Sequence, residues 1–182
     1  MLTVNDKQLK YKFKVKDETY NIIILKVRYT GDPRDIVDRY FDRKDLIVQL
    51  IPESLPCTPR HLAIAVYNAM RAHVQGRNVS KTPNLEVLLY LCGTRQIADA
   101  LKEVKSRSGE IYYLTICSKD VKVLNEVLKE YKLEILDVKG FSKECGSCKD
   151  IKVKELESYL GSYEDKLEKA AITKSTLLNV EI

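Results

Sequence analysis

Cationic side chains gather in one segment of this chain, between Cys57 and Arg107, and they are the residues best suited to binding chemistry. Eight Lys and Arg residues lie there beside three Asp and Glu residues, whereas the rest of the 182-residue chain is balanced in charge. The whole formal net charge of +5 therefore arises in this segment. Such concentrated positive charge predicts a docking surface for an anion, with phosphate backbones as the leading class.

Three of these cations, Arg60, Lys81 and Arg95, lie at or beside predicted helix starts. A helix N-terminus carries partial positive charge, so this position favours an acidic residue by about 0.3–1 kcal/mol. A bound phosphate would resolve the conflict, because backbone amides and a guanidinium group can share it. Alternatively, the long solvated side chains bend away from the helix ends at little cost. The sequence leaves both interpretations open.

Polar and aromatic residues lie among these cations. Gln96 and His61 can hydrogen-bond a base edge, and we expect His61 to be exposed because it lies near the start of a helix. Tyr67 could stack on a base, although core packing beside Val66 is the commoner explanation. His73 lies in the last turn of the same predicted helix, where it would complement the helix C-terminus. Neither histidine has neighbours that indicate general-base work.

The Cys145-Gly146-Ser147-Cys148 motif has the spacing of half a zinc site. It supplies two of the four ligands that a structural zinc site needs, and the sequence has no second pair. A redox motif of the thioredoxin type would start a helix early in a βαβ unit, whereas this one follows a predicted strand. Of the three interpretations, a loop with two thiols is favoured over zinc and redox chemistry. We predict no metal.

Catalytic motifs are absent from the sequence. Its seven glycines form no phosphate-binding loop, and its two histidines limit acid–base chemistry. Neither a Gly-x-Ser-x-Gly nor a His-Glu-x-x-His pattern occurs. We therefore expect a binding protein that is not an enzyme and has no cofactor.

The composition is typical of a folded domain in a reducing compartment. Hydrophobic residues make up 45% of the chain and charged residues 31%, which argues against disorder. No apolar run is long enough to cross a bilayer, and no secretory signal is visible. Five cysteines without a disulfide-like framework fit the cytoplasm best. We predict a single domain over residues 1–182.

Hydrophobic periodicity and turn residues predict a mixture of strands and helices. Strands are expected at 10–16, 20–28, 46–51, 111–117 and 133–138. Helices are expected from Asp32-Pro33 to Arg43, from Thr58-Pro59 to Gly76, from Thr82-Pro83 to Leu91, after a Thr94 cap, and at 119–131, 151–160 and 163–178. Because the two types do not alternate strictly, we expect an α/β (α+β) fold with a small mixed or antiparallel sheet covered by helices.

The stretch from His61 to Val104 resembles a known family. It contains Ala69-Met70-Arg71-Ala72 on a helix, then the turn Gly76-Arg77-Asn78-Val79-Ser80-Lys81, then Cys92-Gly93-Thr94-Arg95-Gln96-Ile97. This pattern is similar to the small kinase-binding regulatory subunit of the KEOPS complex in its archaeal form. The likeness continues loosely through 111–117 and the closing helix.

The resemblance implies a non-catalytic subunit of a tRNA-modification complex. KEOPS installs threonylcarbamoyl on an adenosine beside the anticodon. Its catalytic subunit performs the transfer, and a small atypical kinase acts as an ATPase. The resembled subunit attaches to that kinase, meets the catalytic transferase only indirectly, and in archaeal complexes captures tRNA by its single-stranded 3′ CCA end.

Charge pattern and resemblance together select two sets of candidate residues. The predicted RNA contacts are Arg60, His61, Arg71, Arg77, Lys81, Arg95 and Gln96. The predicted kinase-facing residues form an apolar side of the closing helix: Leu167, Ala171, Leu177, Leu178 and Ile182. Ordinary packing against the sheet explains this second set equally well. Two other functions stay open, a protein-only adaptor without RNA contact and a small enzyme that uses Cys145 and Cys148.

Overall fold

The computed structural model describes residues 3–5, 7–56, 58–105, 109–138, 169–173 and 176–177. The strands within these ranges are β1 (Thr3–Asn5), β2 (Gln8–Val15), β3 (Glu18–Arg28), β4 (Ile47–Pro52), β5 (Ile111–Ser118) and β6 (Glu134–Leu136). The helices are α1 (Pro33–Tyr40), α2 (Pro59–Gln75), α3 (Pro83–Cys92), α4 (Ile97–Lys105) and α5 (Lys122–Glu130). Residues 169–173 add a short helical segment.

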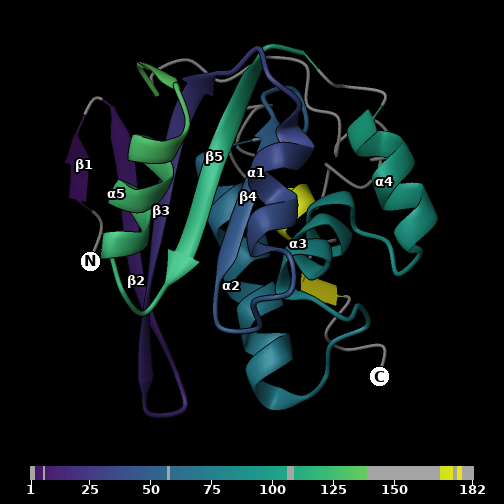
Figure 1. The fold of residues 1–182 in the computed structure, drawn as a ribbon. Helices are drawn as coiled ribbons and strands as arrows, with labels where there is room; N and C mark the ends of the chain where they lie inside the picture. The colour runs from purple at the N-terminus through teal and green to yellow at the C-terminus, as the bar shows by residue number, and fades with distance from the viewer. Residues whose placement is uncertain are drawn as a thin grey trace.

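The strands form one sheet in the order β1-β2-β3-β5-β4, with β3 near its centre (Figure 1). The long strands β2 and β3 form a hairpin whose register runs from Leu9↔Ile24 to Val15↔Glu18. The short strand β6 pairs with residues 26–28 of β3, beyond the part that β2 covers. Every pairing in the described chain is antiparallel. The predicted α+β class is confirmed. Of the two predicted kinds of sheet, mixed or antiparallel, the antiparallel one is correct.

The side chains of β3 alternate between two buried faces of the sheet. Ile22 and Ile24 join the core under α2 and α3, whereas Ile23 and Leu25 join the core under α1 and α5. Figure 1 shows the resulting layers, with α1 and α5 on one side of the sheet and α2 and α3 on the other. A strand buried on both faces needs a continuous apolar run, and residues 22–25 provide one.

The edge strand β4 is buried along its whole length because α1 and α3 both pack against it. Asn84, in the first turn of α3, accepts a hydrogen bond from the Val48 backbone N–H at 3.0 Å. The same amide donates to the Tyr40 carbonyl at 3.3 Å, so it also ties α3 to the end of α1. One buried side chain thereby satisfies edge backbone groups that water cannot reach.

Threonine–proline pairs start α2 and α3 as predicted. The hydroxyls of Thr58 and Thr82 accept hydrogen bonds from the third residue along, at 3.1 and 3.4 Å, and proline takes the first helical position of each helix. Helix α2 ends at Gly76, whose φ of 68° lies in the left-handed region that glycine adopts without strain. These local predictions are confirmed.

Two predicted helix starts are wrong. Helix α4 begins at Ile97, because Thr94 Oγ1 accepts from the Gln96 N–H at 3.1 Å in a turn before the helix. Helix α5 begins at Lys122 rather than Lys119, after a turn in which Asp120 accepts from the Lys122 N–H. The sequence analysis also missed the three-residue strand β1.

Some predicted features lie outside the described residues. They are the Cys145–Cys148 motif, the helix expected at 151–160 and most of the helix expected at 163–178.

We predict that Asn84→Ala lowers the free energy of unfolding by about 1–3 kcal/mol, because it leaves the buried Val48 N–H and Tyr40 carbonyl without these partners. Urea unfolding followed by circular dichroism measures the change. The matched control is Asn125→Ala on α5, an exposed position where we expect a change within about 0.5 kcal/mol. Equal effects of the two substitutions would contradict a bridging function of Asn84.

Candidate functional site

The predicted RNA contacts lie on helix α2, on the loop of residues 76–82 that joins it to α3, and in the turn between α3 and α4. Arg71 lies on α2, Arg77 directly follows its glycine cap, and Lys81 directly precedes the Thr82 cap of α3. The His73 side chain, in the last turn of α2, forms a hydrogen bond with the backbone of Thr82. The start of α3 therefore lies beside the end of α2.

A buried carboxylate holds this loop. Glu86, in the first turn of α3 and 1% exposed, accepts hydrogen bonds from the Ser80 N–H at 2.7 Å and the Ser80 hydroxyl at 2.6 Å. It also accepts from the Val79 N–H at 3.1 Å. Burying a charge without such partners is costly, so these donors are what make the position tolerable. The carboxylate fixes the loop that carries Arg77 and Lys81.

Three arginines lie around Tyr90 of α3, and we call Arg71, Arg77 and Arg95 the arginine cluster. Arg77 and Arg95 line one small pocket together with Tyr90 and Glu86. Burial raises the pKa of the Tyr90 hydroxyl to about 12, with nearby Glu86 adding to the rise, while the positive charges of Arg95 and Arg71 oppose it. Both guanidinium groups therefore lie close enough to Tyr90 to act on it electrostatically.

The pocket itself, about 10 Å³, has room for little more than one water molecule. A larger anion would therefore contact the arginine cluster at the pocket mouth. Guanidinium groups are well suited to binding a phosphate there, because each can donate two parallel hydrogen bonds to two phosphate oxygens.

The expected convergence of three helix starts into one cradle is wrong. Arg60 lies at the start of α2 and Arg77 beyond its end, so a 17-residue helix of about 24 Å separates them. A threonine hydroxyl already accepts a hydrogen bond from one first-turn amide in each of α2 and α3. Arg95 lies before α4 rather than in its first turn. What the structure brings together is the arginine cluster, with Lys81 and Gln96 exposed on the adjoining segments.

The expectation that His61 is exposed is also wrong. Its side chain is completely buried, and burial lowers its pKa to about 4, so it is neutral at pH 7. In this position it cannot meet RNA at the surface. Tyr67 packs edge-to-face against Phe13, with ring centroids 5.1 Å apart, which confirms the core-packing interpretation.

The sequence analysis missed Glu86 and Tyr90. Glu86 had a recognisable sign, since it is one of three acidic residues in the basic segment and follows a threonine–proline helix start. No feature of the sequence marked Tyr90, because its place beside the arginines depends on how the 76–82 loop folds back along α3.

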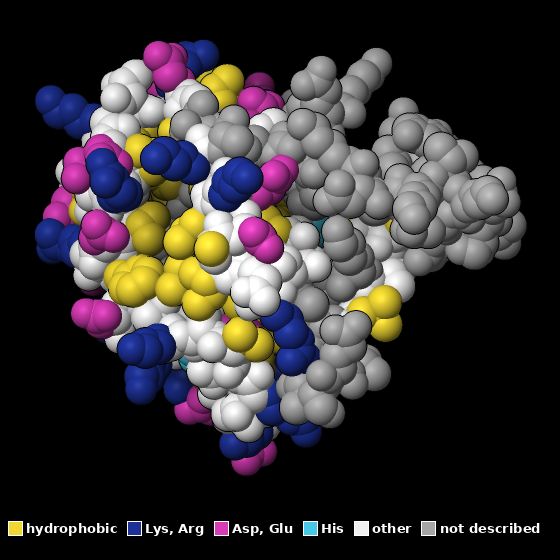
Figure 2. Space-filling view, turned by 90° about the vertical axis from the view of Figure 1, so that its right-hand side faces the viewer, with side chains coloured by type: hydrophobic (Ala, Val, Ile, Leu, Met, Phe, Trp, Pro, Cys, Tyr) yellow, Lys and Arg dark blue, Asp and Glu magenta, His cyan; other side chains and the backbone are white. Residues whose placement is uncertain are grey.

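The predicted kinase-facing residues divide between interior and surface. Ala171 is buried, which fits ordinary packing, whereas Leu177 is 51% exposed. Leu167, Leu178 and Ile182 lie outside the described residues. Figure 2 shows the face on the α4 side of the molecule, where hydrophobic side chains gather between scattered Lys, Arg, Asp and Glu.

Two further searches of the described residues give negative findings. No group of three or more His, Cys, Asp and Glu side chains there is placed to hold a metal ion. No helix among them has the length and apolar character to span a bilayer.

Comparison with known proteins identifies one family and one relative. A family model described as "Kinase binding protein CGI-121" matches residues 34–174. The KEOPS complex subunit Cgi121 of Pyrococcus abyssi (strain GE5 / Orsay) is 48% identical over 42 residues. That stretch is 23% of this chain and 25% of the relative, so the similarity spans a quarter of the curated protein's length.

We predict that Glu86→Gln lowers the free energy of unfolding by about 1.5–3 kcal/mol, because hydrogen bonds to a charged acceptor are replaced by weaker ones. The same change at Glu126, exposed on α5, should cost less than about 0.5 kcal/mol. Chemical denaturation of both variants tests this. A Glu86→Gln protein as stable as wild type would mean that the carboxylate does not hold the loop.

We predict that burial of His61 makes the protein less stable in mild acid. Its folded pKa of about 4 lies below the unfolded value of about 6.5, so the unfolded chain takes the proton first as the pH falls. The stabilisation is complete above pH 6.5 and is lost towards pH 4, by about 2 kcal/mol at pH 5. In the His61→Leu variant, the free energy of unfolding should therefore fall by less between pH 7.5 and pH 5 than in wild type, as measured by urea unfolding at both pH values. An unaltered pH dependence in the variant would contradict the prediction.

Proposed function

The chain belongs to the CGI-121 family of kinase-binding proteins, and from that membership we propose that it binds the small kinase of a KEOPS complex and recruits tRNA to it. The predicted family is confirmed. Proteins of this family are non-catalytic KEOPS subunits, so the prediction that the chain is not an enzyme is confirmed as well. Formation of threonylcarbamoyladenosine would then depend on this protein for substrate capture and on other subunits for chemistry.

The arginine cluster is the observation that carries the tRNA proposal. Three guanidinium groups lie around Tyr90 of α3, in the segment that contains the whole net charge of the chain. The loop that carries Arg77 is held by the buried Glu86. Pre-ordering the cluster lowers the entropy lost when RNA binds.

The 3′ CCA end of tRNA fits such a site because it is single-stranded. A short single strand needs few phosphate contacts and leaves its base edges free for polar side chains. In our proposal Arg71, Arg77 and Arg95 contact phosphates, and the exposed Gln96 beside Arg95 reads a base edge. Lys81 adds positive charge next to the loop.

We predict that Arg77→Glu combined with Arg95→Glu weakens tRNA binding by about tenfold or more, since two phosphate contacts are replaced by repulsion. The control is Arg60→Glu, which reverses a charge about 24 Å away at the other end of α2 and should change affinity less than about threefold. Fluorescence anisotropy with labelled tRNA measures both. With three phosphate contacts to a single strand, log K should fall with log salt at a slope near −2.

Removing the 3′ CCA from the tRNA is the decisive comparison. Trimmed tRNA should bind wild type about as weakly as intact tRNA binds the double variant. Equal binding of trimmed and intact tRNA would refute recognition of the CCA end, and a stronger effect of Arg60→Glu would refute the arginine cluster.

Kinase binding is assigned separately to the closing helix, where Leu177 is exposed. The arginine variants should therefore still co-purify with the kinase in a pull-down, whereas Leu177→Asp should lose the kinase and keep tRNA. If wild type binds the kinase but no tRNA, the protein-only adaptor is the correct function.

A further inference from the structure

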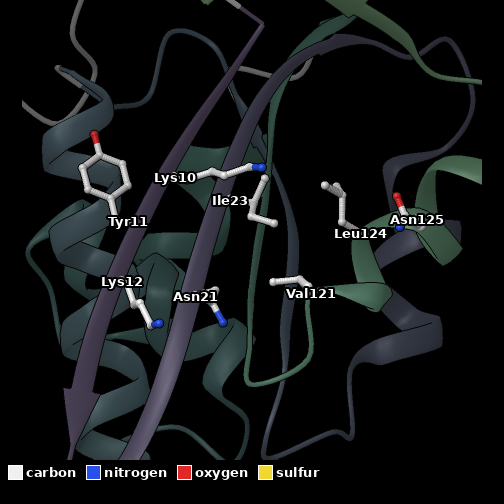
Figure 3. Close-up of a pocket in the computed structure, with 8 residues that line it drawn as sticks. All are labelled: Lys10, Tyr11, Lys12, Asn21, Ile23, Val121, Leu124 and Asn125. Carbon is white, nitrogen blue, oxygen red and sulfur yellow. The ribbon is translucent and has the colours of Figure 1, made fainter. Parts of the chain in front are cut away.

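A groove of about 390 Å³ lies between strand β2 and helix α5, on the side of the sheet opposite α2 and α3. Its strand wall presents Lys10 and Lys12, and its helix wall presents Val121 and Leu124 (Figure 3). The groove lies across the sheet from the helices that carry the arginine cluster, so no residue assigned to RNA or kinase binding takes part in it.

The sheet register puts the strand-wall residues on one face. Lys10 lies opposite Ile23, and Lys12 lies opposite Asn21. Directly opposite residues of an antiparallel pair point to the same side, so all four side chains belong to the groove face. Both lysines are exposed, and neither forms an ion pair within the described chain. Among the described residues, no acidic side chain lines the groove.

The two walls differ in chemistry. The strand wall is cationic, with two lysines whose Cα atoms lie about 7 Å apart along the strand. The helix wall presents the apolar Val121 and Leu124 beside Asn125, and the floor presents Ile23 beside Asn21. Val121, at the start of α5, is 55% exposed. Large apolar side chains left open beside a groove are typical of surfaces that another molecule covers. An occupant must therefore offer negative charge on one side and apolar side chains on the other.

We propose that this groove binds an extended segment of a protein partner in which acidic and apolar residues alternate. In an extended chain, successive side chains point in opposite directions, and those on the same side are about 7 Å apart. Such a segment running along the groove directs its carboxylates to Lys10 and Lys12 and its apolar side chains to Val121 and Leu124. The peptide segment then matches both the charge of the strand wall and the spacing of the side chains on the two walls.

RNA fits this groove less well than protein. The described lining of the groove includes no arginine, and the aromatic residue in it, Tyr11, points away from the opening (Figure 3). Base stacking and phosphate forks are the usual contacts to a single strand. The apolar side chains of the helix wall would gain little from contact with a sugar–phosphate chain.

The test uses the full-length protein and two synthetic eight-residue peptides, one alternating Leu and Glu and the other alternating Leu and Gln. Peptide titrations are followed by the backbone amide signals in nuclear magnetic resonance spectra. We expect the Leu-Glu peptide to shift amides of residues 10–12, 21–23 and 121–125, and to bind at least about fivefold more tightly than the Leu-Gln peptide. Equal binding of the two peptides, or shifts that leave these residues unaffected, would overturn the proposal.

Two pairs of substitutions make the test specific to the groove. Lys10→Gln with Lys12→Gln should weaken binding of the Leu-Glu peptide by about five- to tenfold, since two ion pairs are lost. Lys102→Gln with Lys105→Gln removes the same charge from α4 and should change affinity less than about twofold. Similar losses in both pairs would show non-specific attraction and refute the groove. An eight-nucleotide oligouridylate that displaces the peptide would likewise refute it in favour of RNA.

Discussion

The central strand β3 is the constraint on which the rest of the structure depends. It is buried on both faces and paired along both edges, by β2 and β6 on one side and β5 on the other. Successive residues such as Ile22 and Ile23 therefore belong to different cores. A slip of one residue in its register would move each of these side chains to the opposite core. Because the register is set, the arginine cluster and the lysine-lined groove lie on opposite sides of the sheet.

Burial of one acidic side chain organises the basic surface. Glu86 accepts hydrogen bonds from Val79 and Ser80, and this contact folds the 76–82 loop against α3. Arg77 then comes to the same pocket as Arg95, although 18 positions separate them along the chain. At the starts of α2 and α3, a threonine hydroxyl already accepts a hydrogen bond from one first-turn amide. Side-chain convergence is thus what makes the surface a candidate for binding RNA.

Local features of the fold could be predicted because their causes are local. Thr58, Thr82 and Gly76 mark helix ends through contacts within a few residues, and these boundaries are correct. The apolar run at 22–25 identified the central strand for the same reason. Thr94 failed as a cap because its hydroxyl bonds inside a turn two residues before α4. His61 was misplaced because the face that a first-turn residue presents depends on how the whole helix packs.

The sequence by itself determined the types of the elements, a fold class that allows an antiparallel sheet, the location of the net charge and the family resemblance. Composition, periodicity and capping are properties of neighbouring residues, so they can be read without the fold. Only the tertiary structure decided which cations share a surface. It separated Arg60 from Arg77 by the length of α2, brought Arg95 to Arg77, and buried His61. The physical reason is that electrostatic and hydrogen-bond contacts depend on distance in space, which loop closure and sheet register establish only once the chain is folded.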